Sequence, residues 1–473
     1  MTALPESVYK YIENAWQTKT LEALKDFVRL PAKSRDFDPD WEQNGVLLQA
    51  LETAADWGRK MIPNGRFEII SAPTLTPALF VDIPATSNHA GRPAFFYGHF
   101  DKQPETEGWE PGLGPWMPVL KDGKLYGRGT VDDGYSFYLV MTIVRALDEN
   151  GIPRSAVKGL FETDEESGSR DLTHYLRTFA SQIGSPAFLG ILDLGASDWS
   201  RVWLTQSLRG VIGMTVTVRV LNTAAHSGTS SGIVPSSFRI LRTLLDRIED
   251  SETGEILLPA FHTTIPENCR KAVEILSQTT DVRTGFDWAG KTQAAQPDGA
   301  SAMLANTWKP SLSVVGAAGL PSLKNASSLL RKETSLRLSF RIPPGVDAKQ
   351  AITEAIDTLT VNVPYNAEVI VSDIGGEPGF VAPELCGWLK DTMDEAGRRH
   401  FGQEPGSVFC GASIGTLPAF QRAFPHSPFL NTGALGPGTN AHAPNEWLNI
   451  PYVTKLSAVL ADVLAGIPKD EEK

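Results

Sequence analysis

Five acids and two histidines occur along this chain in an order that could hold two metal ions around one shared water. They lie in short segments rich in glycine or in neighbouring carboxylates, and they are His99, Asp101, Asp132, Glu165, Glu166, Asp193 and His442. Zinc accepts histidine nitrogen and carboxylate oxygen together, and two ions about 3.5–4 Å apart need a carboxylate that bridges them. The ordered set therefore predicts metal-assisted hydrolysis.

The first six members of this set also have ordinary structural explanations. His99 and Asp101 could form a polar loop after a strand, and Asp132 could cap a following helix. The pair Glu165–Glu166 could lie in a solvated acidic loop, and Asp193, which follows an apolar run, could be paired with a helix terminus. All of these explanations would have to hold together, so the joint pattern favours a metal centre.

Asp132 is the natural bridge between the two ions. We expect His99 and Asp193 to complete the protein ligands of one ion, and Glu166 and His442 to complete those of the other. Both ions would then keep open positions for water and substrate.

Glu165 directly precedes the predicted ligand Glu166 in an extended or turning segment. Neighbouring side chains in such a segment point in different directions, so Glu165 would face the shared water and act as the general base. Asp101, two residues after His99, would orient the imidazole of that histidine.

An α/β sheet is predicted to position these residues. Short apolar runs alternate with helical patterns such as 135–150, and the runs are Ala78–Asp82, Pro93–Tyr97, Ala156–Phe161 and Phe188–Leu192. Polar residues of the set follow the last three runs. Open α/β sheets bind ligands beyond the carboxyl ends of their strands, so these residues would converge on one crevice.

The pattern changes near Leu208, where a strand with alternating apolar and polar residues begins. The elements expected after it are a helix from Pro235, strands at Ser311–Val315 and Thr334–Ile342, a helix at Asp347–Leu359 and a strand at Ala367–Ser372. The order β-α-β-β-α-β predicts a ferredoxin-like sandwich, interrupted by residues 250–309, which are assigned to no element. We predict an α/β catalytic domain of residues 1–207 and 376–473, with a second domain of residues 208–375 inserted into it.

Composition limits the possible partners. The formal net charge of -12 argues against nucleic acid or an anionic membrane as the main partner. The chain begins with a polar helical stretch, Glu6–Lys25, and has no apolar run long enough for a signal peptide or a bilayer span. Its three cysteines are far apart, which suits a reducing compartment. We expect a soluble cytoplasmic protein.

Four of the motifs resemble those of the M20 metallopeptidases, a family that includes carnosine dipeptidases, aminoacylases and desuccinylases. They are Gly98–Asp101, Lys124–Gly129, Asp132–Gly134 and Glu165–Ser169. The resemblance covers nearly the whole chain, and the segment Gly108–Gly129 is most similar to the carnosine dipeptidase branch. It implies a zinc-peptidase-like catalytic domain, an inserted lid domain that forms a homodimer, two bridged zinc or manganese ions, and a cis peptide bond between Asp132 and Asp133.

Two positions of the predicted lid also match the family. His226 corresponds to a histidine that reaches the active site of the neighbouring subunit and helps to stabilise the oxyanion. Arg341 lies on the polar face of its strand, where a guanidinium could grip a substrate carboxylate together with Ser413. Without the resemblance, a surface-loop histidine and a solvent-exposed strand arginine are the ordinary explanations.

The resemblance implies hydrolysis of the amide bond in dipeptides or short peptides with a free C-terminal carboxylate. Deacylation of N-acyl amino acids differs only in the pocket and is the alternative. A metal-binding or interaction protein without catalysis is disfavoured, because all ligands and Glu165 are present. Where carnosine dipeptidases carry Arg-Glu-Gly-Gly-Ser-Ile-Pro, this chain has Phe409–Gly415, with Cys410 in place of the glutamate. We expect this change to shift the preference toward uncharged or acylated amino ends.

Overall fold

The computed structural model describes residues 3–89 and 91–469. Two compact units divide the chain: the first runs to Gln206 and takes in Ala382–Val408 and the chain from Gly415 onward, and the second contains Ser207–Val381 and Phe409–Ile414. The sequence placed residues 376–473 entirely in the first domain, whereas the structure assigns the strip Phe409–Ile414 to the second unit. The physical reason is a tertiary one, because Arg209 donates its backbone N–H to the carbonyl of Cys410 and its side-chain Nε–H to the carbonyl of Gly411.

The first unit is built on a six-stranded sheet, in agreement with the predicted α/β class. Its strands, in spatial order, are β1 (Arg66–Ile70), β2 (Ala78–Ile83), β6 (Val157–Glu162), β3 (Ala94–His99), β7 (Phe188–Ile191) and β17 (Phe429–Asn431). The last four strands run parallel to one another, whereas β2 is antiparallel to both β1 and β6. The central strand β3 is buried along its whole length, as expected for a parallel strand covered on both faces.

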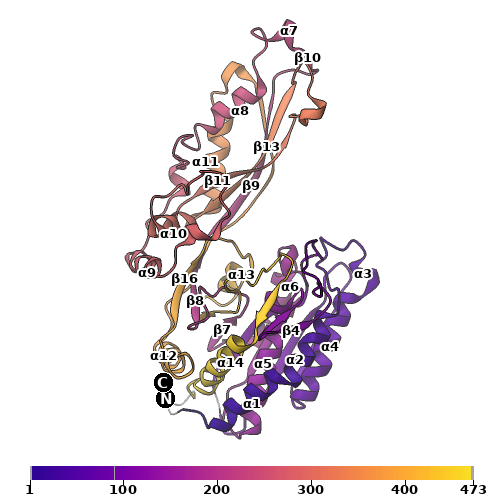
Figure 1. Ribbon diagram of the computed structural model, residues 1–473, viewed down its shortest axis with the longest axis vertical. Coiled ribbons are helices and arrows are strands. Elements are labelled where there is room, and N and C mark those ends of the chain that lie inside the picture. Colours follow the sequence, from indigo (N-terminus) through magenta and orange to yellow (C-terminus); the bar gives the residue numbers. More distant parts are fainter. Residues whose placement is uncertain (1–2, 90, 470–473) are drawn as a thin grey trace. The chain divides into compact units, whose positions relative to one another are not determined.

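Helices pack on both faces of this sheet (Figure 1). On one face, Phe80 stacks on Phe179 of α6 (Leu172–Ile183) with ring centroids 4.1 Å apart. On the other face, Phe161 meets Phe137 of α5 (Tyr135–Glu149), whose ring centroid lies 5.1 Å away. Aromatic pairs of this kind stabilise the packing of helices on the sheet, in addition to the stabilisation that comes from burying apolar surface.

The carboxyl ends of the parallel strands lie at one edge of the sheet. His99 at the end of β3 pairs in register with Glu162 at the end of β6, and Tyr97 pairs with Ile191 at the end of β7. The segments that leave these three strands therefore start side by side. This edge is where an open α/β sheet binds its ligands.

The second unit is the predicted β-α-β-β-α-β sandwich. In chain order its elements are β9 (Gly210–Arg219), α8 (Ser237–Leu245), β11 (Ser311–Ala318), β13 (Glu333–Ile342), α11 (Ala348–Thr360) and β14 (Glu368–Glu377). The sheet order is β11-β13-β9-β14 with all neighbours antiparallel, which is the split β-α-β arrangement. One face carries the core, including Met214 and Leu338, under Leu241 and Ala355 of the two helices.

The segment that the sequence left unassigned, residues 250–309, contains two helices, α9 (Glu267–Ser277) and α10 (Gly299–Trp308). The predicted N-terminal helical stretch is two helices, because Thr18 leaves the helical conformation with φ -132° and ψ -104°. The remaining elements are α1 (Glu6–Gln17), α2 (Lys19–Val28), α3 (Trp41–Asn44), α4 (Val46–Met61), β4 (Val119–Lys121), β5 (Lys124–Tyr126), β8 (Trp203–Leu208), β10 (Ala225–His226), α7 (Ser227–Ser230), β12 (Leu329–Leu330), β15 (Phe380–Val381), α12 (Gly387–Phe401), β16 (Gly406–Cys410), α13 (Thr416–Ala423), β18 (Trp447–Asn449) and α14 (Ile450–Ala465). Within the described ranges, no helix has both the length and the apolar character that a bilayer crossing requires.

Candidate metal centre

Asp132 lies in a tight turn, Thr130–Gly134, that leads into α5. The turn is entered through Gly129, whose φ of 80° favours glycine, and the Asp132–Asp133 peptide bond is cis, as the resemblance implied. The two carboxylate oxygens of Asp132 meet different histidines. Oδ1 lies 3.1 Å from Nε2 of His99, and Oδ2 lies 2.9 Å from Nε2 of His442.

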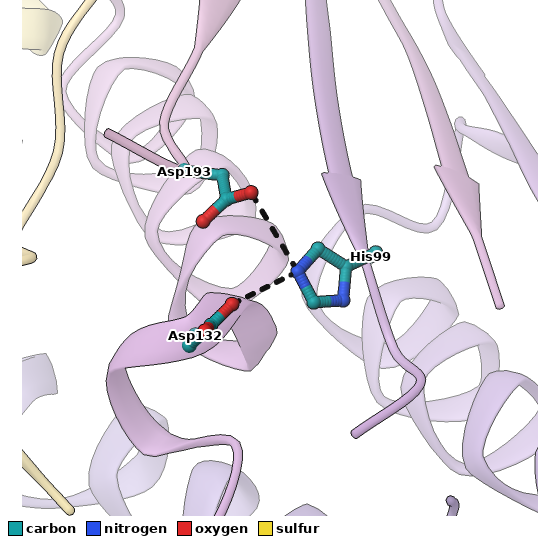
Figure 2. A group of neighbouring side chains, drawn as sticks. All are labelled: His99, Asp132 and Asp193. Atoms are coloured by element: carbon teal, nitrogen blue, oxygen red, sulfur yellow. Dashed lines mark hydrogen bonds and ion pairs between the residues drawn. The ribbon is translucent and has the colours of Figure 1, made fainter. Parts of the chain in front are cut away.

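Two groups of possible ligands share this carboxylate. The first contains His99, Asp132 and Asp193, and Nε2 of His99 lies 3.7 Å from Oδ2 of Asp193 (Figure 2). The second contains Asp132, Glu166 and His442, and Nε2 of His442 lies 3.2 Å from Oε2 of Glu166. Within each group the ligand atoms all lie within 4.8 Å of one another. The structure thus brings together all five residues that the sequence expected to bind two ions.

The charges of this cluster fit divalent cations. Burial, with repulsion from Asp132, raises the pKa of Asp193 well above its ordinary value and raises the pKa of Glu166. For Asp132 burial acts in the same direction, but hydrogen bonds from His442 and His99 outweigh it and lower the pKa. Burying several carboxylates together is costly unless cations neutralise them. The mixed nitrogen and oxygen donors are those that zinc and manganese accept.

Asp101 links the first histidine to the loop that carries the two glutamates. One oxygen of its carboxylate lies 3.3 Å from Nδ1 of His99, which also lies 3.0 Å from the backbone carbonyl of Asp101. The same carboxylate accepts the backbone N–H groups of Glu165 at 3.2 Å and Glu166 at 3.0 Å. A hydrogen on Nδ1 leaves Nε2 free for a metal, which is the arrangement of a carboxylate–histidine–metal triad.

Glu165 lies beside the cluster without belonging to either ligand group. Its carboxylate accepts no hydrogen bond from any residue in the described part of the chain. Burial raises the pKa of Glu165 well above its ordinary value, and the neighbouring charges of Glu166, Asp132 and Asp101 act in the same direction. A carboxylate whose proton affinity is raised in this way has the character of a general base.

Sequence reasoning missed three residues that support the cluster. Gln103 donates a hydrogen bond from Nε2 to Oε2 of Glu166 over 2.6 Å. Arg128 and Glu446 form a fully buried ion pair of 2.7 Å, and Oε1 of Glu446 also accepts the N–H of Gly129. Only the position of Gln103, two residues after Asp101, offered a local signal. The partner of Arg128 lies 318 residues away, beyond any local pattern.

Replacing Glu446 by glutamine is expected to destabilise the first unit by about 3–5 kcal/mol, because the buried Arg128 guanidinium would lose its counter-charge. Urea unfolding followed by fluorescence measures the change. Glu404→Gln is the matched control, since Glu404 pairs with Arg398 at the surface, where both side chains are 54% exposed, and such pairs contribute less than about 1 kcal/mol. Equal effects of the two substitutions would contradict a structural role for the buried pair.

The three predicted substrate contacts belong to the second unit. NH1 of Arg341 donates a hydrogen bond of 2.8 Å to Oγ of Ser413, so the structure brings these two residues together. His226 is exposed, and its Nδ1 accepts the backbone N–H of Gly228 at 3.1 Å. Their contacts with a substrate remain predictions.

The family model described as peptidase family M20/M25/M40 matches residues 95–466. The chain belongs to this family. It is a peptidase-type hydrolase, and the predicted resemblance is confirmed.

Similarity to individual M20 proteins extends over most of the chain. The human Beta-Ala-His dipeptidase is 24% identical over 474 residues, which cover 94% of this chain and 89% of that protein. The cysteinylglycine-S-conjugate dipeptidase of Corynebacterium striatum is 23% identical over 78% of this chain and 79% of its own length. The solved structure of human carnosine dipeptidase 1 has a TM-score of 0.75 at 21% identity, covering 98% of this chain and 99% of that one, and so shares the fold.

Proposed function

We propose that this M20 hydrolase cleaves the amide bond of dipeptides or short peptides that carry a free C-terminal carboxylate, with the help of two metal ions. The observation that carries the proposal is the pair of ligand groups that share Asp132, with the unpaired carboxylate of Glu165 beside them. The full-length similarity to proteins named as dipeptidases supports the substrate class.

The residues proposed to hold the ions are His99, Asp132 and Asp193 for one, and Asp132, Glu166 and His442 for the other. Zinc is the proposed metal and manganese the alternative, because both accept this donor set. When bound, the two cations polarise the scissile carbonyl and lower the pKa of the shared water.

Glu165 takes the proton of the attacking water and returns it to the leaving amine, which a single carboxylate beside the reacting atoms can do in both directions. Asp101 keeps His99 in the required tautomer and holds the backbone that carries Glu165. His226 of a neighbouring subunit stabilises the oxyanion by donating a hydrogen bond. Arg341, with Ser413, binds the substrate carboxylate through charge-assisted hydrogen bonds.

The site as proposed needs a homodimer, formed through the second unit. An edge strand with exposed apolar side chains supports this surface: β11 lies at one edge of the sheet, and Val314 and Val315 on it are 51% and 63% exposed. Such edges are sites of pairing with another chain. We also propose a cytoplasmic location, on the basis of the three separated cysteines, which are unpaired in the structure.

A substrate panel with chelation tests the proposed reaction. A dipeptide such as Ala-Ala, its C-terminal amide and the corresponding N-acetyl and N-succinyl amino acids are compared by kcat/KM. We expect the free dipeptide to be cleaved fastest, activity to disappear after chelation, and zinc or manganese to restore it. Activity that survives complete metal removal would refute the proposed chemistry.

Faster cleavage of the acylated amino acids than of the free dipeptide would establish the deacylase alternative. One observation at Cys410 favours this alternative. Burial raises the pKa of the Cys410 thiol, so this position presents no negative charge to a substrate ammonium.

The Arg341→Met variant tests carboxylate recognition within the same panel. The loss of a charged hydrogen bond of about 1.5–3 kcal/mol is expected to lower kcat/KM for the free dipeptide about 10- to 100-fold. The value for the C-terminal amide should change little, because the amide has no carboxylate for Arg341 to bind. An equal loss on both substrates would assign Arg341 a structural role instead.

A further inference from the structure

A cavity of about 740 Å³ lies in the second unit, along the segment that the sequence left unassigned. Its walls are formed by the turn around Gly254, the residues 262–265, one residue of α9 and the end of α10 with the start of β11. None of the residues proposed to bind metal or the substrate carboxylate lines it. Its volume lies in the range of about 300–1,000 Å³ that is typical of sites for small molecules.

A buried donor without an acceptor belongs to a residue of the cavity wall. Trp308 lines the wall and is only 3% exposed, and its indole N–H has no hydrogen-bond partner among the residues that the structure describes. Buried indole N–H groups normally find an acceptor, so an unmade bond here is unusual. An acceptor atom on a bound molecule would satisfy it.

Charges of both signs line the same cavity. Arg270 and Lys309 supply the positive charges, and Glu249 and Glu255 supply the negative ones. In the described ranges, none of these four side chains forms an ion pair with another residue. Glu249 is half-buried and the other three residues are exposed. Unpaired charges of opposite sign around one cavity favour a ligand that carries both charges, because each ligand group then meets its complement.

The rest of the wall mixes polar residues, such as His262 and Thr263, with the apolar residues Ile256, Ile265 and Leu312. The apolar residues offer a surface for an apolar side chain, and the polar groups fix the orientation of a small molecule. The ligand should therefore combine a carboxylate and an ammonium with an apolar side chain.

We propose that this cavity is a second ligand site, distinct from the metal centre, that binds a free amino acid with an apolar side chain. The carboxylate of the ligand meets Arg270, Lys309 and the indole N–H of Trp308, and its ammonium meets Glu249. Trp308 belongs to a buried cluster with Ile265 and Cys269, and Phe409, the first residue of the strip that carries Ser413, packs against this cluster.

Calorimetric titration of the metal-loaded protein with L-leucine tests the proposal without any measurement of turnover. We expect L-leucine to bind, and leucinamide and N-acetyl-leucine, which each lack one charge, to bind at least about 10-fold more weakly. Trp308→Phe keeps an aromatic ring and deletes the donor, and Arg270→Met deletes one cation. Each should weaken L-leucine binding about 10-fold. Lys271→Met is the matched control on α9, because Lys271 lies near Glu267 and does not line the cavity.

Arg341→Met separates the cavity from the proposed substrate site, and it should leave L-leucine binding unchanged. Binding that is lost in Arg341→Met and kept in Trp308→Phe and Arg270→Met would place the ligand at the substrate site and overturn the proposal. Equal binding of the three probes would also overturn it, since recognition would then not depend on both charges. Absence of L-leucine binding to the folded unsubstituted protein would do the same.

Discussion

Replacing Glu165 by glutamine is expected to abolish peptide hydrolysis while both metal ions stay bound. Glutamine has nearly the same shape but cannot take the proton of the attacking water, and general-base catalysis contributes about 10²–10⁴-fold to such reactions. The ligand groups would remain, since Glu165 belongs to neither of them and Asp101 binds the backbone N–H rather than the side chain of residue 165. Turnover and the metal content per chain, measured on the same sample, check both halves of the prediction.

The adjacent residue provides the contrast for this experiment. Glu166→Gln should lower both metal content and activity, because Glu166 is proposed as a ligand of the second ion. Substitution of Glu165 would then remove activity alone, whereas substitution of its neighbour Glu166 would remove both activity and bound metal. Turnover near that of the unsubstituted protein in Glu165→Gln would rule out its role as the base.

Replacing Asp132 by asparagine is expected to remove both ions and all measurable activity. Its two oxygens approach two different histidines, so one substitution alters both ligand groups at once. A neutral amide also removes the negative charge that a bridging ligand supplies between two cations. Asp193→Asn changes only the first ligand group. This variant should lose one ion and keep the second at reduced occupancy. Metal content per chain distinguishes the two variants.

Asp133→Asn is the matched control for the bridge. Asp133 is the next residue in the chain and is also buried, and its carboxylate accepts the backbone N–H of His99 at 3.3 Å. Asparagine can still accept this hydrogen bond, so both ions should be retained. If Asp132→Asn kept two ions, Asp132 would not be the bridge.

The sequence predicted the parts of the fold that follow local rules. The apolar runs before His99 and Asp193 are strands of the central sheet, and parallel strands end at one edge, so the residues after them had to approach one another. The alternation after Leu208 likewise predicted β9 and its sheet. That the gathered side chains bind metal stays a prediction.

Features that depend on distant contacts could not be predicted in this way. The pairing of Arg128 with Glu446 joins residues far apart in the chain, and no local sequence pattern predicts it. Helices α9 and α10 are short and bury few residues each, so their apolar pattern is weak. The sequence also gave no sign that the strip Phe409–Ile414 joins the second unit, because hydrogen bonds from Arg209 determine its place and the local composition does not.

That strip has a consequence for any attempt to isolate the second unit. A fragment that spans Ser207–Val381 is continuous in sequence, but it omits Phe409, which packs against the cluster that contains Trp308, and the carbonyl groups of Cys410 and Gly411 that Arg209 binds. Such a fragment would leave an aromatic surface open to solvent, and the buried guanidinium of Arg209 would keep the acceptors Lys309 and Ser311 but lose the carbonyl of Gly411. The second unit is therefore complete only when the later segment 409–414 packs onto it. A separately expressed version would need these residues joined to it by a linker.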